Sequence, residues 1–464
     1  MLITVLLTVV VLLGGLNLLA SLALTLVNFP VRTARLDTVT GVLPSPAALP
    51  FVSVHVAIHD EPADLVIATM EALARSDYPA FEVLVVDNNT PDPATWIPVS
   101  EHAETLGERF CFRHFDGVEG AKAGALNLAL ELSDPQTAYV AIVDADYQVA
   151  PDFIATAVAA CGPTVQFVQF PQAYRCATGA ADVVSELSAY FAIFPRAANR
   201  TQASLLTGTL SMISVEALRQ VGGWPTQSIT EDAELGLQLW SAGARGRYID
   251  REAGHGLLPM DLAGLRLQRT RWVTGNIQTL IGGRRVLLRA PAGFLAVLAQ
   301  LTAWLGLLAV PLATLILVAV ARAFPAVGDA APSWMWRSAE LIASATFVCA
   351  FVGHGLRAIA RGRIGSIAVS SALLWSSSFG WLPALCSRQL RFRRTPKGPT
   401  AARSKLSIDC ICSLIALGAS GLFALEGSLP TALILLLGAG GLVTAPIVDR
   451  SLRRAAESGA KCKA

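Results

Sequence analysis

Hydrophobic and polar positions divide the chain into three parts with different patterns. The first 31 residues carry no charged side chain, and about 20 apolar residues are enough to cross a bilayer. From about residue 50 to residue 290, charged residues appear and short apolar runs alternate with helical patterns. From residue 291 to residue 449 long apolar runs return. The pattern therefore predicts one water-facing domain inserted between transmembrane helices.

Residues 50–290 show the alternation of strands and helices that is typical of an α/β domain. Strands are expected at Val52–Ile58, Phe81–Asp87, Tyr139–Asp144 and Val165–Phe170. Helices are expected at Pro62–Arg75, Ala121–Leu132 and Pro151–Ala160. This order predicts a parallel, doubly wound sheet in a single domain of ordinary size.

The flanking parts predict a multi-pass protein of a bacterial-type inner or plasma membrane. Residues 1–31 lack a basic start and are too long for a cleaved signal peptide, so we expect an uncleaved membrane helix. Arg32 and Arg35 follow this helix, and the positive-inside rule then places the next domain in the cytoplasm. Four further spans bring the expected total to five: Phe294–Val320, Ser338–Leu356, Leu406–Leu425 and Leu429–Val448.

The segment Gly365–Cys386 is apolar but contains six serines, and it lies between two basic runs. Both basic runs should face the cytoplasm, which a spanning helix between them would not allow. We therefore expect an interfacial helix at 365–386, a basic cytoplasmic loop at 387–405 and a cytoplasmic tail at 450–464.

Composition agrees with this picture, because 53% of the 464 residues are hydrophobic and only 15% are charged. A mean hydropathy of +0.53 is too high for a soluble enzyme of this length. The eight cysteines form no Cys-x-x-Cys pair, so neither a zinc site nor a disulfide framework is expected. The net charge of +2 gives no reason to expect a nucleic-acid partner.

Two carboxylates, Asp144 and Asp146, follow the strand expected at Tyr139–Asp144. Ligands of open α/β sheets bind beyond the carboxyl ends of the strands. Oxygen ligands at that edge suit Mg²⁺ or Mn²⁺, which commonly share them with phosphates. The alternative is that both aspartates are solvated turn residues.

Three other polar positions are candidates for the same site. Asp87 ends its strand and could accept hydrogen bonds from a nucleotide, or it could simply cap the turn. Lys122 lies in a glycine-rich turn that opens a helix, where it could meet a phosphate, although the spacing is not that of a P-loop. Asp232 lies in the first turn of a helix that Thr230 should cap, so we expect it to stay ionised and to be available as a base. The alternative is that acidic residues in this first turn only stabilise the helix.

The run 267–272, Leu-Gln-Arg-Thr-Arg-Trp, lies in a region that has arginines and no acidic residue between Asp261 and Asp329. Guanidinium groups suit a diphosphate, and an indole face suits a sugar ring or a membrane interface. Trp304 and other tryptophans of the apolar part could also stack on sugars, although anchoring at the interface is their commoner role. A basic amphipathic helix resting on lipid is the alternative for the whole run.

Together these motifs resemble glycosyltransferase family 2, in its membrane-embedded processive branch with cellulose, curdlan and hyaluronan synthases. The resemblance covers Val52–Trp272 and returns at Phe392–Lys397. It is carried, in family order, by Asp87, Asp144-Ala145-Asp146, Thr230-Glu231-Asp232 and Gln268-Arg269-Thr270-Arg271-Trp272.

The resemblance implies a glycosyltransferase-A-like domain, a nucleotide-diphosphosugar donor, Mg²⁺ or Mn²⁺, and inversion at the anomeric carbon. In this comparison Asp146 would hold the metal and Asp232 would be the catalytic base. The donor would be contacted by Asp87, Lys122, Asp144 and Glu231, and the acceptor and diphosphate by Gln268, Arg271 and Trp272. Thr395 and Lys397 are similar to residues of the family's gating loop, while Arg394 and Pro396 depart from it.

These observations predict an enzyme that moves a hexose, from UDP-glucose by family analogy, to a growing β-linked polysaccharide and exports the product. One alternative is the transfer of a single sugar to a membrane lipid. Another is a non-catalytic transporter or scaffold whose α/β domain only binds nucleotide. The expected partners are thus the donor, a carbohydrate acceptor and the lipid bilayer, and the sequence identifies no accessory subunit.

Overall fold

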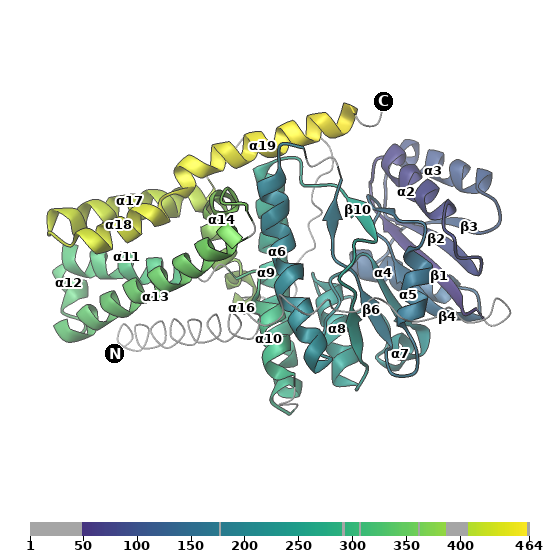
Figure 1. Ribbon diagram of the computed structural model, residues 1–464, viewed down its shortest axis with the longest axis horizontal. Helices are drawn as coiled ribbons and strands as arrows, with labels where there is room; N and C mark the ends of the chain where they lie inside the picture. Colours follow the sequence, from purple (N-terminus) through teal and green to yellow (C-terminus); the bar gives the residue numbers. More distant parts are fainter. Residues whose placement is uncertain are drawn as a thin grey trace.

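The structure is a computed structural model, and it describes residues 49–175, 178–289, 293–305, 308–360, 362–386 and 407–461. An α/β domain lies at one end and a bundle of helices at the other (Figure 1). The long helices α6 and α9 stand between the two, and α19 runs from the bundle across to the α/β domain. The predicted order of domain and apolar helices therefore agrees with the described part of the chain.

A seven-stranded sheet forms the centre of the α/β domain, in the order β3-β2-β1-β4-β8-β6-β9. The strands β3, β2, β1 and β4 are parallel, as expected, but β8 runs antiparallel to both β4 and β6. The sheet is thus mixed rather than wholly parallel, because the short β8 enters between two strands that run the other way. The strands are β1 Phe51–Ile58, β2 Phe81–Asn88, β3 Phe110–Phe115, β4 Thr137–Ile142, β6 Phe167–Gln169, β8 Ser211–Ser214 and β9 Gly246–Tyr248.

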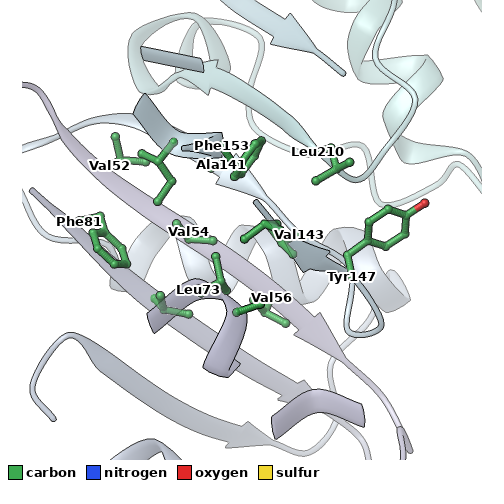
Figure 2. Close-up of a cluster of buried hydrophobic side chains, with 14 of the residues drawn as sticks. Val52, Val54, Val56, Leu73, Phe81, Ala141, Val143, Tyr147, Phe153 and Leu210 are labelled. Atoms are coloured by element: carbon green, nitrogen blue, oxygen red, sulfur yellow. The ribbon is translucent and has the colours of Figure 1, made fainter. Parts of the chain in front are cut away.

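The core of this domain explains why the central strands form where the apolar runs predict them. Val52, Val54 and Val56 of β1 are fully buried and face the same cluster (Figure 2). Each such side chain contributes roughly 1.5–3 kcal/mol by leaving water. In the register of the sheet Ile58 lies opposite Asp87, so the carboxyl ends of β1 and β2 meet at one edge.

Helices cover both faces of the sheet, and the predicted helices agree with them to within two residues. Those of the domain are α2 Ala63–Ala74, α3 Pro93–Thr105, α4 Ala121–Leu132, α5 Phe153–Ala160, α6 Ala181–Ala198, α7 Val215–Gln220, α8 Glu231–Ser241 and α9 Leu262–Arg289, with the 3₁₀ turn η3 Asn199–Thr201. A small second sheet joins β5 Gln148–Val149, β10 Gly254–Gly256 and β7 Ala173–Tyr174. Gly256 has no room for a side chain there, because a Cβ would lie 2.2 Å from the ring of Tyr147.

The apolar part consists of helices that pack on one another and on α9. They are α10 Phe294–Thr302, α11 Ala309–Ala323, α12 Pro325–Gly328, α13 Ser333–Ala360, α14 Ser366–Ala372, α15 Leu374–Phe379, α16 Leu382–Cys386, α17 Ile408–Leu425, α18 Leu429–Gly438 and α19 Gly441–Lys461. Over the described ranges, three segments are long and apolar enough to cross a membrane: Ser333–Ala360, Ile408–Leu425 and Leu429–Ser458.

Two of the expected helices differ from the structure. The span expected at Phe294–Val320 is divided into α10 and the 15-residue α11, and α10 packs against the α/β domain through Val297 and Leu301. The interfacial helix expected at Gly365–Cys386 is three short helices, whose serines and Trp375 are largely buried against neighbouring helices. Apolar composition alone did not show that these residues pack on protein.

Some expectations fall outside the described residues. These are the first span at residues 1–31 and the basic loop at 387–405, with the gating-loop candidates Thr395 and Lys397.

Candidate active site

Asp87 ends β2 in a buried hydrogen-bonded position. Its carboxylate accepts a hydrogen bond of 2.5 Å from the hydroxyl of Thr90, and its other oxygen lies 2.5 Å from Nδ1 of His114. His114 stacks on Trp96, with ring centroids 4.5 Å apart. The neighbouring Asn89 exchanges two hydrogen bonds with the backbone of Val118, which holds the glycine-rich turn against β2. Asp87 thus lies at the predicted sheet edge, fully buried and held by Thr90 and His114.

Lys122 brings two of the predicted acidic residues together. Its Nζ lies 2.5 Å from Oδ1 of Asp144 and 3.6 Å from Oε1 of Glu231. Burial lowers the pKa of Lys122, but attraction to Asp144, Glu231 and Asp232 outweighs this effect and raises the pKa above its usual value. The ammonium group therefore stays charged at the centre of an acidic cluster, where a diphosphate could exchange for one of its carboxylate partners.

The position of Lys122 depends on the turn that precedes α4. Gly120 adopts the left-handed conformation, with a φ of 81°, and a Cβ on it would lie 2.6 Å from Cβ of Thr226. Glycine is therefore required at this point, both for the backbone conformation and for the close approach of the loop before α8.

Asp144 and Asp146 lie just beyond β4, which ends at Ile142. The backbone N–H of Asp144 donates to the hydroxyl of Thr209, and Oδ2 of Asp146 accepts from the backbone N–H of Leu257 at 3.1 Å. No group of three or more His, Cys, Asp or Glu side chains that could hold a metal ion occurs in the described part of the chain. Two carboxylates at the sheet edge still fit Mg²⁺ or Mn²⁺, because Mg²⁺ commonly takes one or two carboxylates and completes its shell with water and phosphate oxygens.

Asp232 lies in the first turn of α8, next to Glu231. Burial and the neighbouring charge of Glu231 raise its pKa to about 7, although Lys122 and Arg271 act in the opposite direction. Near neutral pH Asp232 is therefore only partly ionised, whereas the sequence predicts that it stays ionised, because desolvation and Glu231 outweigh the groups that lower its pKa. Thr230 occupies the N-cap position without the expected side-chain hydrogen bond to the helix.

A pocket opens beside Asp232 and is lined by aromatic and polar side chains. Its walls are Gln172, Tyr190, Phe191, Leu205, Leu206, Thr207, Thr230, Asp232, Ala233, Trp272, Asn276, Gln300, Leu301 and Trp304. Trp304 stacks on Tyr190 at 4.7 Å between ring centroids and lies 4.7 Å from Trp272. Aromatic faces with a few polar groups are suited to a sugar ring.

Arg269 holds this aromatic wall in place. It makes two hydrogen bonds to Glu186 of α6, at 3.0 and 2.7 Å, and its guanidinium lies 4.3 Å from the ring centroid of Trp304. Both side chains of the pair are almost removed from water, with exposed fractions of 5% and 11%. The predicted Trp272 thus lines the pocket, whereas Arg269 stabilises the wall behind it.

Helix α9 reaches the pocket because it packs closely on the start of α8. A Cβ on Gly275 would lie 2.3 Å from the hydroxyl oxygen of Thr230, so only glycine permits this contact. Arg271 acts electrostatically on Asp232 from the same helix. Gln268 is also on α9, and its side-chain oxygen has no hydrogen-bond partner among the described residues.

The sequence motifs therefore point to one region, but they do not reveal all of its residues. Tyr190, Glu186 and His114 contribute to it and were not identified from the sequence. One sequence signal could have pointed to Glu186. Residues 262–328 contain arginines but no acidic residue, so an arginine that becomes buried there needs an acidic partner from another segment.

Comparisons with known proteins identify the family that the α/β domain and the helices after it match. Residues 53–222 match glycosyl transferase family 2, and residues 139–356 match glycosyl transferase family group 2. The chain therefore contains a glycosyltransferase family 2 domain, with a glycosyltransferase-A fold followed by helices long and apolar enough to span a membrane.

Two relatives show which branch of the family the chain is similar to. It is 30% identical over 247 residues to glucomannan 4-beta-mannosyltransferase 7 of Arabidopsis thaliana, over 50% of this chain and 44% of the relative. It is 26% identical over 249 residues to the UDP-forming cellulose synthase catalytic subunit of Xanthomonas axonopodis, over 49% of this chain and 32% of the relative. The chain thus matches less than half the length of these curated relatives.

A solved structure supports the fold. The mannosyltransferase PcManGT from Pyrobaculum calidifontis, in complex with GDP-Man and Mn²⁺, covers 82% of this chain and 97% of its own. The two share 21% sequence identity with a TM-score of 0.52. This similarity shows a common fold.

Proposed function

We propose that the protein transfers a hexose from a nucleotide-diphosphosugar to a growing β-linked polysaccharide, with inversion at the anomeric carbon. One observation carries the proposal: Lys122, Asp144 and Glu231 meet at the sheet edge beside Asp232, whose pKa is raised to about 7. A carboxylate with a pKa near neutral pH is partly deprotonated at that pH, and it is basic enough to accept a proton from a hydroxyl group.

In this proposal Asp232 accepts the proton of the acceptor hydroxyl as its oxygen attacks the anomeric carbon. The bond to the diphosphate breaks on the opposite face, which inverts the configuration. Lys122 and Arg271 stabilise the negative charge on the departing diphosphate. Asp87, Asp144 and Glu231 position the donor, and Trp272, with Gln268, positions the acceptor sugar.

Asp146 would hold Mg²⁺ or Mn²⁺. When bound, the ion supplies Lewis-acid neutralisation of the diphosphate charge. The proposal is supported by the two carboxylates at the sheet edge and by Mn²⁺ in the solved PcManGT complex.

The donor we propose first is UDP-glucose, and GDP-mannose is its competitor. The UDP-forming cellulose synthase relative supports the first, while the glucomannan mannosyltransferase relative and the GDP-Man complex support the second. The export of the product through the apolar helices, a cytoplasmic catalytic domain and a gating loop at Thr395 and Lys397 belong to the same proposal.

The test is an assay of the purified protein in nanodiscs with a panel of UDP- and GDP-sugars, with Mg²⁺ or Mn²⁺, followed by product sizing and linkage digestion. We expect a long β-linked glycan from one donor. A lipid-extractable product that carries a single sugar would replace the polymer with a glycolipid. Absence of transfer from every donor would favour a non-catalytic nucleotide-binding protein.

A further inference from the structure

Helix α9 is tied to two apolar helices by carboxylates that the proposed reaction does not use. One is Asp409 in the first turn of α17, and the other is Asp449 in α19. Since α9 carries Arg271 and Trp272, these contacts connect the pocket with the part of the molecule that is apolar enough to lie in a membrane.

Asp409 joins three segments through its two oxygens. Oδ1 accepts hydrogen bonds from the backbone N–H groups of Trp375 and Ser376, at 3.1 and 2.9 Å, where α15 begins. Oδ2 lies 3.0 Å from Nε of Arg266 in an ion pair. Arg266 also donates to the carbonyl of Ala372 at 3.0 Å. One carboxylate thus fixes α9 and α15 to the start of α17.

The buried ion pair of Asp409 and Arg266 is not the most stabilising choice for this position. The side chain of Asp409 is 1% exposed, and taking a carboxylate and a guanidinium out of water carries a large desolvation penalty. A packed apolar pair of similar volume is often as stable or more so. An ionisable residue in an apolar helix therefore indicates a role in geometry or function.

Asp449 makes the second contact, at the beginning of α9. Its Oδ1 accepts from the backbone N–H of Leu262 at 3.0 Å, while its Oδ2 accepts from Arg453 at 2.7 Å. Leu262 and Arg266 occupy the first turns of the continuous helix that continues to Trp272. A tilt of α9 at these contacts therefore moves Trp272 relative to Asp232.

We propose that Asp409 is a positioning residue that holds α9 against the apolar helices, so that Trp272 and Arg271 stay aligned with Asp232. The donor groups Lys122, Asp144 and Glu231 lie outside α9, which contributes Trp272 to the pocket and Arg271 to the diphosphate. The loss of this contact should therefore reduce sugar transfer more than donor hydrolysis. The expected effect on transfer rests on the proposed function, whereas the role of Asp409 in holding α9 does not.

The test uses the full chain in nanodiscs with the variant Asp409→Asn, which keeps an oxygen for the N–H groups of Trp375 and Ser376 but removes the charge. We expect faster amide hydrogen exchange in α9 and at residues 374–377, with no change in the sheet. Transfer to a sugar acceptor should fall roughly 10- to 100-fold, whereas hydrolysis of the donor by water, which does not need Trp272, should fall by a clearly smaller factor.

Two further variants sharpen the result. Glu426→Gln alters an ion pair with Arg322 next to the other end of α17, and it should change neither measurement. The double variant Arg266→Gln/Asp409→Asn should lose less transfer than the losses of the two single variants combined, because both residues take part in one ion pair.

The proposal is overturned if hydrogen exchange in α9 is unchanged, or if the rates of hydrolysis and transfer fall by the same factor. If the wild-type protein neither hydrolyses nor transfers any donor, the proposed function fails, and the exchange measurement still decides whether Asp409 holds α9.

Discussion

Asp232 is subject to opposing influences that set its pKa near neutral pH. Burial and Glu231 raise the pKa to about 7, while Lys122 and Arg271 lower it. A base acts in its deprotonated form, so kcat/KM should rise with pH below about 7 and level off above it. The pH dependence of initial transfer rates measures this limb. A flat profile between pH 5 and 8 would remove Asp232 from the role of base.

Lys122 offers a separate test of the same electrostatic cluster. Replacing it with glutamine removes a positive charge that lowers the pKa of Asp232. The acid limb of the profile should therefore move to higher pH, and donor affinity should fall roughly tenfold with the loss of a charged phosphate contact. Profiles of Lys122→Gln and wild type at saturating donor provide the comparison, and an unshifted limb would contradict the coupling.

At the residue scale the sequence predicts the charged groups but not their energies. Asp144, Glu231 and Lys122 meet because Asp144 follows β4, while the first turns of α4 and α8 carry the other two side chains to it. The pKa of Asp232 could not be predicted, since it depends on burial in the fold and on Arg271 of α9, a helix that begins 30 residues later. Glu186 is likewise recognisable only once α6 lies beside α9.

At the scale of elements, the contact between α8 and α9 can be tested with a matched pair of glycines. Gly275→Ala places a methyl group 2.3 Å from the hydroxyl of Thr230, and it should cost about 1–3 kcal/mol of stability and reduce transfer. Gly282 lies on the same helix, and a Cβ added there would have no atom within 4 Å, so Gly282→Ala should be neutral or stabilising by up to about 1 kcal/mol. Thermal unfolding in detergent and transfer rates measure both, and equal effects would contradict the contact.

Apolar runs predict four of the seven strands of the main sheet, β1, β2, β4 and β6, but not β3, β8 and β9. Such runs are less informative in the apolar part, where membrane-facing and protein-facing helices have similar compositions. The continuous helix expected at Phe294–Val320 is wrong for this reason, since Gln300 hydrogen-bonds to the backbone of Leu205 and Ala203 in the α/β domain. A buried glutamine within the apolar run is the sequence signal for that contact.

At the scale of the whole molecule, the structure combines the α/β domain with helices whose exposed surface is apolar. Many of the exposed large hydrophobic side chains lie on α13, α17 and α18, including Leu341, Leu425 and Leu433. Exposed apolar surface of this extent indicates burial in lipid. We therefore expect the protein to stay in the membrane fraction after washes with high salt and alkaline carbonate, and to be released by detergent. Release by salt alone would indicate a peripheral association.

The central claim is that Asp232 is the base of a sugar transfer at this site. The most direct measurement compares wild type and Asp232→Asn for initial rates of hexose transfer and for donor binding, in the same nanodiscs with Mg²⁺ or Mn²⁺. We predict that transfer falls roughly 10²- to 10⁴-fold while the donor still binds, as expected for the loss of a general base. Transfer by Asp232→Asn at the wild-type rate would contradict the claim.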